Sequence, residues 1–364
     1  MKKIIQDNSI EFISIKEMDI VGKISQKDIN VQSCADYYLS SIEKEAFCYF
    51  QDPFRSLPTL NIFVKSKSLE IAESANKILQ KKGIDASIAA SLEFFVFDKY
   101  EYITSAFFQS LKLHDEGFPS TVHTNSTSQN DLLSNINAEI ISNLQQIGVK
   151  TKFHYCLPNT SQNISKCIIE LLDTDIVTIC NNIIIAKYII RNVVASYGKY
   201  ASFMPLPIKE VDCNMPAHLV VGGVNLISFS ESINKNIDFI NGFIYIATNS
   251  YKKLLNLNKL CIIKDNKIFF KSLDMIGNPY LIFSCLLLTG TAENIDNPHL
   301  ANSDANCKQS DLNISLEKIE TGNSYFKQFL GEELLKKYLT AVKQLQKEVN
   351  LYPSPAEFKT YSEL

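Results

Sequence analysis

The sequence feature that most constrains the fold is a long, mostly apolar segment from Asp175 to Tyr197, which Gly198 follows. This segment predicts a long helix within a protein core, with Lys187 and Arg191 on its polar face. Shorter segments on both sides of it alternate between strand and helix patterns. Strands that alternate with helices of this length indicate an α+β or α/β domain.

Length and composition are those of a soluble globular protein. The 364 residues are enough for one large domain or two smaller ones with a core. Hydrophobic residues make up 46% of the chain and charged residues 21%, which is ordinary for this class. The net charge is -3 and there is no basic run, so we expect no binding to nucleic acid or to a membrane surface.

The nine cysteines are scattered, and no two of them form a Cys-x-x-Cys pair. An odd number without a spacing pattern indicates reduced thiols in a cytoplasmic protein. The first residues are too polar for a signal peptide. The apolar run from Tyr280 to Leu288 is too short to span a bilayer, so we expect no membrane partner.

Local patterns predict the secondary structure, with a domain boundary near Lys67. Helices are expected at residues 68–81, 131–147, 278–288 and 331–349. Strands are expected at residues 10–15, 60–64, 86–97, 150–157, 201–204 and 218–228. A hairpin at residues 260–273 turns at Asp265-Asn266, and residues 121–131, rich in Ser, Thr and Asn, are expected to form a loop.

The strand at residues 86–97 carries one acidic side chain, Glu93, two residues after Ser91. Side chains two positions apart share one face of a strand. Glu93 has two interpretations, a metal ligand or a carboxylate paired with a nearby lysine. The second is favoured, because buried charges are paired as a rule.

A series of short segments resembles bacterial type I glutamine synthetases. Eight or more of them occur in the order of that family, from the Glu93 strand to the end of the chain, and so the chain is identified as a member. The segments are residues 93–98, 117–119, 161–163, 187–194, 198–199, 203–207, 223–226, 248–254, 278–281 and 353–358, of which the first reads Glu93-Phe94-Phe95-Val96-Phe97-Asp98.

The resemblance implies an α+β fold with two domains. Residues 1–66 would form a small β-grasp-like N-terminal domain, and residues 67–364 a catalytic-type domain in which helices flank an antiparallel sheet. It also implies ATP with Mg²⁺ or Mn²⁺ as cofactors, glutamate and ammonia as substrates, and a ring-shaped homo-oligomer. The family reaction is ATP-dependent ligation of ammonia to glutamate through γ-glutamyl phosphate.

Most of the metal ligands that the resemblance implies are missing. The family uses five glutamates and one histidine, and only Glu93 of the matched residues can ligate a hard cation well. We therefore expect weak or no metal binding. The six matched residues are Ser91, Glu93, Cys156, Ile164, Pro216 and Phe269.

Three further residues are candidates for a catalytic role by resemblance. His218 matches a histidine that would touch a substrate carboxylate, although a structural histidine is at least as good an interpretation. Lys271 stands where the family has an arginine, and the two are not interchangeable. Ser41 lies in a segment similar to the family's ammonium loop, whose aspartate is lost. Asp212 replaces a loop glycine, and its carboxylate would repel glutamate and phosphate.

Three functions follow from these losses. The first is a pseudoenzyme of the family, either the product of a decaying gene or a binding or regulatory subunit. The second is a residual ATP-dependent amine ligase with an altered substrate. The third is a structural partner that joins rings of an active synthetase. The combined loss of metal ligands and arginines favours the first, since each loss removes transition-state stabilisation.

Overall fold

The strand predicted at residues 86–97 is the centre of the larger sheet in the computed structural model of the protein. The structure describes residues 1–33, 36–104, 109–114, 132–159, 164–207, 212–254, 260–292, 311–322 and 325–350. The larger sheet has the order β12-β13-β11-β5-β9-β8, and β10 also pairs with β5. Its strands are β5 (Asp85–Phe97), β8 (Thr151–Asn159), β9 (Ile164–Leu171), β10 (Tyr200–Ser202), β11 (Ala217–Gly222), β12 (Cys261–Lys264) and β13 (Lys267–Phe270).

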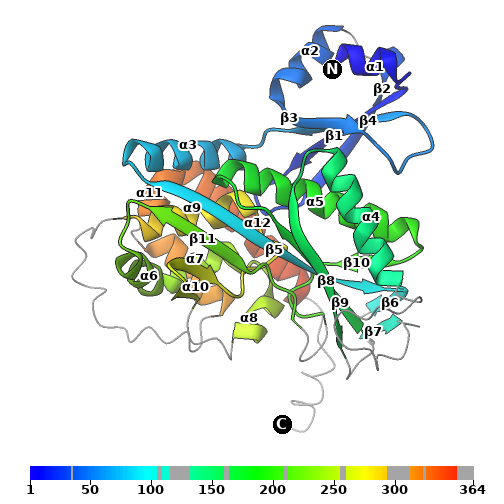
Figure 1. The fold of residues 1–364 in the computed structure, drawn as a ribbon. Coiled ribbons are helices and arrows are strands. Elements are labelled where there is room, and N and C mark those ends of the chain that lie inside the picture. The colour runs from blue at the N-terminus through cyan, green and yellow to red at the C-terminus, as the bar shows by residue number, and fades with distance from the viewer. Residues whose placement is uncertain are drawn as a thin grey trace.

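Every pairing in this sheet is antiparallel. Helices pack against it, and Figure 1 shows β5 and β11 in front of α9 (Pro279–Gly290). The prediction of an α+β fold with helices flanking an antiparallel sheet is therefore confirmed. Of these helices, α3 (Lys67–Lys81) and α5 (Ile176–Ser196) contact β5, α4 (Leu132–Gln146) contacts β8, and α9 packs on α3 and α5.

The long apolar helix, α5, forms as predicted. The Asp175 carboxylate caps it by accepting hydrogen bonds from the backbone N–H groups of Val177 and Thr178. Gly198, with φ of +70°, turns the chain after it. Length and composition alone would allow α5 to span a membrane, but most of its apolar length is buried inside this fold. A core helix satisfies the same criteria.

One prediction about α5 is wrong. Lys187 was expected on a polar face, but its side chain is buried, with 5% of the residue exposed. Its Nζ donates to the Met275 carbonyl at 2.7 Å. Burial, reinforced by Arg191, lowers the pKa of Lys187 to about 7. The helix is apolar on nearly all sides, so its sequence shows no sharp boundary between a buried and an exposed face.

The N-terminal residues form a smaller mixed sheet of order β2-β1-β4-β3. Its central pair, β1 and β4, is parallel, and the outer pairs are antiparallel. Ile13, Leu60 and Ile62 belong to a separate apolar cluster there. This arrangement resembles the expected β-grasp, while the division into domains at residue 66 stays a prediction. The elements are α1 (Lys2–Asp7), β1 (Phe12–Met18), β2 (Ile24–Asn30), a 3₁₀ turn (Val31–Ser33), α2 (Asp36–Glu45), β3 (Ala46–Gln51) and β4 (Thr59–Val64).

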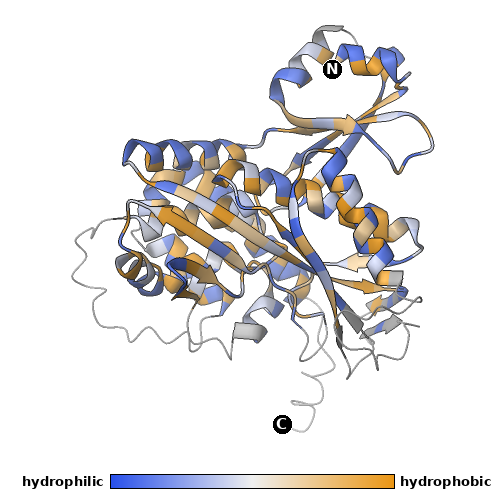
Figure 2. Ribbon diagram, viewed as in Figure 1, coloured by the Kyte–Doolittle hydropathy of each residue, from blue (hydrophilic) through white to orange (hydrophobic). Residues whose placement is uncertain are grey.

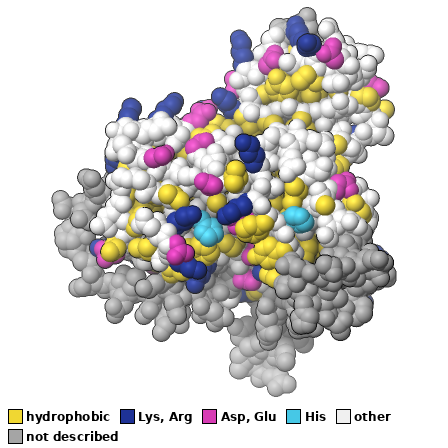
Figure 3. Space-filling view, viewed as in Figure 1, with side chains coloured by type: hydrophobic (Ala, Val, Ile, Leu, Met, Phe, Trp, Pro, Cys, Tyr) yellow, Lys and Arg dark blue, Asp and Glu magenta, His cyan; other side chains and the backbone are white. Residues whose placement is uncertain are grey.

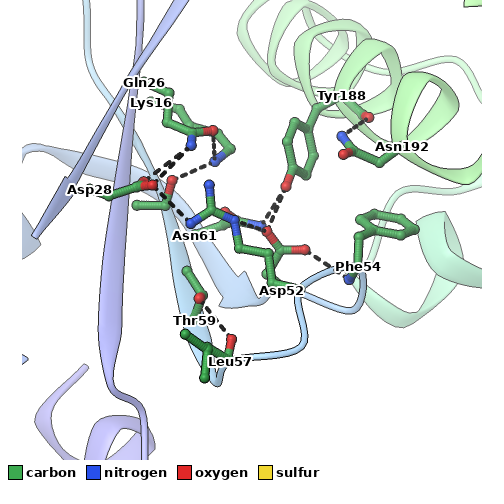
Figure 4. Close-up of polar contacts among 12 residues, drawn as sticks. Lys16, Gln26, Asp28, Asp52, Phe54, Leu57, Thr59, Asn61, Tyr188 and Asn192 are labelled. Carbon is green, nitrogen blue, oxygen red and sulfur yellow. Dashed lines mark hydrogen bonds and ion pairs between the residues drawn. The ribbon is translucent and has the colours of Figure 1, made fainter. Parts of the chain in front are cut away.

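Polar groups join the N-terminal sheet to α5 (Figure 4). The Tyr188 hydroxyl donates to Asp52 Oδ2 at 2.7 Å and accepts from Asn61 Nδ2 at 3.2 Å. Lys16 Nζ lies 4.6 Å from the centroid of the Tyr188 ring. Burial lowers the pKa of Lys16 to about 8, although Asp52 opposes the change. The two parts of the chain thus meet through a buried polar network.

Asn278 forms a second link between the two parts. Its side-chain oxygen caps α9 by accepting from the N–H groups of Tyr280 and Leu281. Its Nδ2 donates to the carbonyls of Asp19 and Ile20 and to Ser68 Oγ. One amide therefore caps a core helix and holds the loop between β1 and β2.

Two turns determine where the neighbouring strands end. Asp265 and Asn266 have φ of 50° and 56°, so the predicted hairpin turn is confirmed. The strand predicted at residues 218–228 is too long, because β11 ends at Gly222. Gly223, with φ of +79°, then reverses the chain against the backbone at Gly83, where a Cβ would meet a carbonyl at 2.8 Å. Asn225 caps a new helix, α6 (Leu226–Lys235).

The remaining elements are further helices and a two-stranded sheet of β6 and β7. Figure 2 shows hydrophobic residues concentrated in β11, β5 and the helices behind them. Helices are confirmed at the predicted positions 68–81, 131–147, 278–288 and 331–349 within a few residues. The expected loop at residues 121–131 lies outside the described residues. The elements not yet named are β6 (Lys99–Thr104), β7 (Gln109–His114), α7 (Ile237–Ile244), α8 (Thr248–Leu254), α10 (Leu312–Thr321), α11 (Tyr325–Leu330) and α12 (Glu332–Asn350).

Candidate functional site

One face of the larger sheet gathers the polar residues of the candidate site. Ser91 lies opposite Glu170 and Glu93 opposite Ile168, in the pairing of β5 with β9. His218 on β11 lies opposite Ala89. Opposite residues point to the same side of a sheet, and residues two apart on a strand share a face. This face, called here the Glu93 face, carries Ser91, Glu93, Tyr155, Lys166, Glu170, His218 and Phe269.

Glu93 is the centre of this face, and its carboxylate is engaged within the chain. Lys166 Nζ donates to Glu93 Oε2 at 3.0 Å, and the Asn214 backbone N–H donates to the same oxygen at 2.9 Å. Only 7% of Glu93 is exposed. Lys166 also donates to the Asp212 carbonyl at 3.3 Å and lies 3.7 Å from its carboxylate. The structure thus shows Glu93 paired with a lysine, which is the interpretation that the sequence favoured.

Burial and charge act against each other in this cluster. Burial raises the pKa of Glu93 above its ordinary value, although Lys166 and the Asn214 N–H oppose the change. For Lys166, burial lowers the pKa, but Glu93 and Asp212 outweigh it, so the pKa is raised. Lys166 therefore stays protonated and supplies the positive charge beside Glu93.

A second carboxylate lies on the Glu93 face next to the serine. Ser91 Oγ donates to Glu170 Oε2 at 3.4 Å, and Lys152 Nζ donates to Glu170 Oε1 at 3.1 Å. Glu170 is buried, whereas the Lys152 side chain is exposed. Like Glu93, Glu170 is neutralised by a lysine of the same chain.

His218 lies at the edge of this group. Its ring meets Phe269 edge-on, with 4.3 Å between the centroids. Burial lowers the pKa of His218, and Lys267, Lys152 and Lys264 act in the same direction, while Glu170 raises it. A neutral imidazole results near pH 7, which could accept or donate one hydrogen bond.

The other two predicted catalytic residues come from different parts of the fold. Lys271 is exposed and follows directly after β13. Ser41 is exposed on α2, which Figure 1 shows in the N-terminal part, away from β5. A role for Ser41 would require a neighbouring subunit, as the resemblance implies. Both assignments stay predictions.

One matched metal position faces away from Glu93. Cys156 lies opposite Cys167, which lies opposite Phe94, so Cys156 points to the other side of the sheet. There its sulfur accepts a hydrogen bond from Asn137 Nδ2 of α4 at 3.1 Å. Tyr155 takes the place on the Glu93 face instead. Cys156 matches a metal ligand by its order in the sequence, but its side chain lies on the face of the sheet opposite to Glu93.

The described residues do not fit a pair of divalent cations. Among them, no group of three or more His, Cys, Asp or Glu side chains lies close enough to hold a metal. Glu93 and Glu170 each accept a hydrogen bond from a lysine, and Phe269 offers no donor atom. A hard cation needs several free oxygens.

Sequence reasoning missed Lys166 and Glu170, because it predicted no strand at residues 164–171. The signal was present. Polar residues at 166 and 170 alternate with the buried Cys167, Ile169 and Leu171, which is the pattern of a half-buried strand. On the face in view, Figure 3 shows basic, acidic and apolar side chains mixed.

Solved structures share this fold. A glutamine synthetase from Plasmodium falciparum, studied by cryo-EM, matches with a TM-score of 0.75 at 16% identity over 98% of this chain and 96% of that chain. A GmaS structure without ligand matches with a TM-score of 0.75 at 14% identity, over 100% and 99% of the two chains. At these identities the likeness concerns the fold alone.

Sequence comparisons point the same way. The glutamine synthetase of Azospirillum brasilense is 28% identical over 66% of this chain, and that match spans 64% of its own length. The match to the Rhizobium meliloti enzyme spans 58% of that protein, so the chain spans less than two thirds of both relatives. The Nostoc enzyme is 24% identical over 99% of this chain and 98% of its own. The profile of the glutamine synthetase catalytic domain matches residues 68–256, just over half of the chain, and the chain therefore belongs to the glutamine synthetase family.

Proposed function

We propose that this chain is a glutamine synthetase family member impaired in ATP-dependent ligation of ammonia to glutamate, and that it acts as a binding or regulatory subunit. The observation that carries the proposal is the ion pair between Glu93 and Lys166, with 3.0 Å between Nζ and Oε2. The lysine supplies the positive charge that a metal ion would otherwise bring to this carboxylate.

The geometry around Glu93 supports this interpretation. The oxygen that accepts from Lys166 also accepts the Asn214 N–H, so a cation approaching that oxygen would have to displace two donors. Phosphoryl transfer depends on metals and cationic groups that neutralise the phosphate. Here the nearby cations Lys166 and Lys152 already pair with Glu93 and Glu170. These two lysines are therefore engaged and not free to neutralise a bound phosphate.

Substrates, assembly and location belong to the same proposal. The family uses ATP, divalent metals, glutamate and ammonia. The resemblance to this family also implies an oligomeric assembly. We propose a homo-oligomer or a subunit that joins an active synthetase, in the cytoplasm. Ser41, exposed on α2, belongs to the segment that resembles the loop which one subunit of the family supplies to its neighbour's ammonium site.

Calorimetric titration of the purified chain with ATP, in excess Mg²⁺ and then Mn²⁺, tests the proposal. We expect no binding heat up to millimolar ATP. Micromolar, metal-dependent binding would overturn the proposal and favour an amine ligase with a rebuilt site. Light scattering supplies the second readout: a monodisperse ring supports a subunit role, and a monomer that binds no synthetase contradicts it.

A further inference from the structure

Two thiols face each other on the side of the sheet opposite to Glu93. Cys156 on β8 and Cys167 on β9 are directly opposite in the antiparallel register. Their sulfur atoms lie 2.9 Å apart, and neither is in a disulfide. Directly opposite residues of an antiparallel pair have Cα atoms about 4.5 to 5.5 Å apart. That separation lies within the range that a disulfide spans, so the bond needs little movement of the backbone.

The two thiols differ in access and in environment. Cys156 is half-buried on the outermost strand, whereas Cys167 is fully buried. Asn137, itself buried, donates to the Cys156 sulfur at 3.1 Å. A hydrogen bond to a thiolate is stronger than one to a neutral thiol. Cys156 is therefore placed to meet an oxidant first, and Cys167 to react with the product.

We propose that Cys156 and Cys167 form a reversible disulfide when the protein meets a hydroperoxide. The Cys156 thiolate attacks the peroxide oxygen and the O–O bond breaks, which gives a sulfenic acid and hydroxide, or an alkoxide where the peroxide is organic; the leaving group then takes up a proton. The Cys167 sulfur then attacks the Cys156 sulfur, an S–S bond forms, and the sulfenic oxygen leaves as water. The two thiols lose two electrons and two protons, and the peroxide is reduced to water or an alcohol.

The bond would fasten β8 to β9 beneath α4. These strands carry Tyr155, Lys166 and Glu170 on their other face. Oxidation would therefore stiffen the hairpin that holds Lys166 against Glu93. The expected result is a rise in the midpoint of thermal unfolding that dithiothreitol reverses, because a cross-link restricts the unfolded chain.

Mass spectrometry of the full chain tests the proposal. The protein is treated with hydrogen peroxide, remaining thiols are blocked with N-ethylmaleimide under denaturing conditions, and the protein is digested. Trypsin cuts after Lys166 and so separates the two cysteines, and a Glu-specific protease cutting at Glu170 separates Cys167 from Cys180. We expect one cross-linked peptide pair, the loss of two maleimide labels, and recovery of both after dithiothreitol.

Variants sharpen the result. With Cys167→Ser, Cys156 should accumulate as a sulfenic acid that dimedone labels. Cys48→Ser is the matched control, since Cys48 is also half-buried and burial raises its pKa to about 11. In this variant the cross-link between Cys156 and Cys167 should form as it does in the wild type. The proposal fails if wild-type Cys156 accumulates dimedone or sulfinic acid adducts while Cys167 still accepts maleimide. That wild-type measurement decides the matter even if a serine variant does not fold.

Discussion

At the scale of the residue, the buried pair of Glu93 and Lys166 makes a measurable contribution to stability. Lys166→Met would leave a buried carboxylate without its cation, and we expect the free energy of unfolding to fall by about 3 kcal/mol. Adding Glu93→Gln to that variant should recover part of the loss, because no buried charge then remains. Urea unfolding of the two single variants and the double variant measures the coupling.

The matched control is an exposed ion pair of similar length. Lys337 Nζ lies 2.7 Å from Glu333 Oε1 on the surface of α12. Lys337→Met should change the free energy of unfolding by less than about 1 kcal/mol. Equal losses for Lys166→Met and Lys337→Met would show that burial adds nothing at Glu93.

Lys187 gives stability a particular pH dependence. Its pKa is about 7 in the fold against an ordinary 10.5. Between these values the unfolded chain binds a proton that the folded chain lacks, so the free energy of unfolding rises with pH, by up to about 1.4 kcal/mol per pH unit. Below pH 7 both states are protonated and this contribution to the slope vanishes. Lys187→Met should remove it, which urea unfolding at pH 6 to 9.5 would detect; parallel curves for wild type and variant would contradict it.

At the scale of the element, caps decide where helices begin. Asn278→Ala removes the α9 cap and three hydrogen bonds to the N-terminal part, so we expect a loss of about 3 kcal/mol. Asn225→Ala removes only the cap of α6 and should cost about 1 kcal/mol. Thermal or urea unfolding compares the two, and equal costs would refute the second role of Asn278.

Sequence patterns predicted elements best where local signals are strong. Asp175, Asn278 and Gly198 mark ends of α5 and α9, and the structure uses them as such. The overlong strand at 218–228 failed because Gly223 turns the chain through a tertiary contact with Gly83. The pairing of Lys166 with Glu93 joins residues 73 positions apart. No local pattern specifies such a pair, and so the candidate site was only partly predictable.

At the scale of the whole molecule, Tyr188 couples the N-terminal sheet to the core. Tyr188→Phe removes the donor to the buried Asp52 and the acceptor for Asn61. We expect a loss of about 2 kcal/mol and faster amide exchange in β4, because both partners stay buried. Tyr197→Phe is the control, since the Tyr197 hydroxyl bonds Glu139 at an exposed position. Unchanged exchange in β4 of Tyr188→Phe would show that other contacts hold the sheet.

The links through Tyr188 and Asn278 also impose an order in time on a growing chain. Asp52 precedes Tyr188 by 136 residues, and Ser68 precedes Asn278 by 210. Synthesis proceeds at about 5 to 20 residues per second. Roughly 10 to 40 s therefore pass between completion of the N-terminal sheet and synthesis of Asn278, the later of the two linking residues. During that interval Lys16, Asp52 and Asn61 face water or a chaperone. Translation speed beyond residue 68 would therefore govern how long this surface stays open to wrong partners.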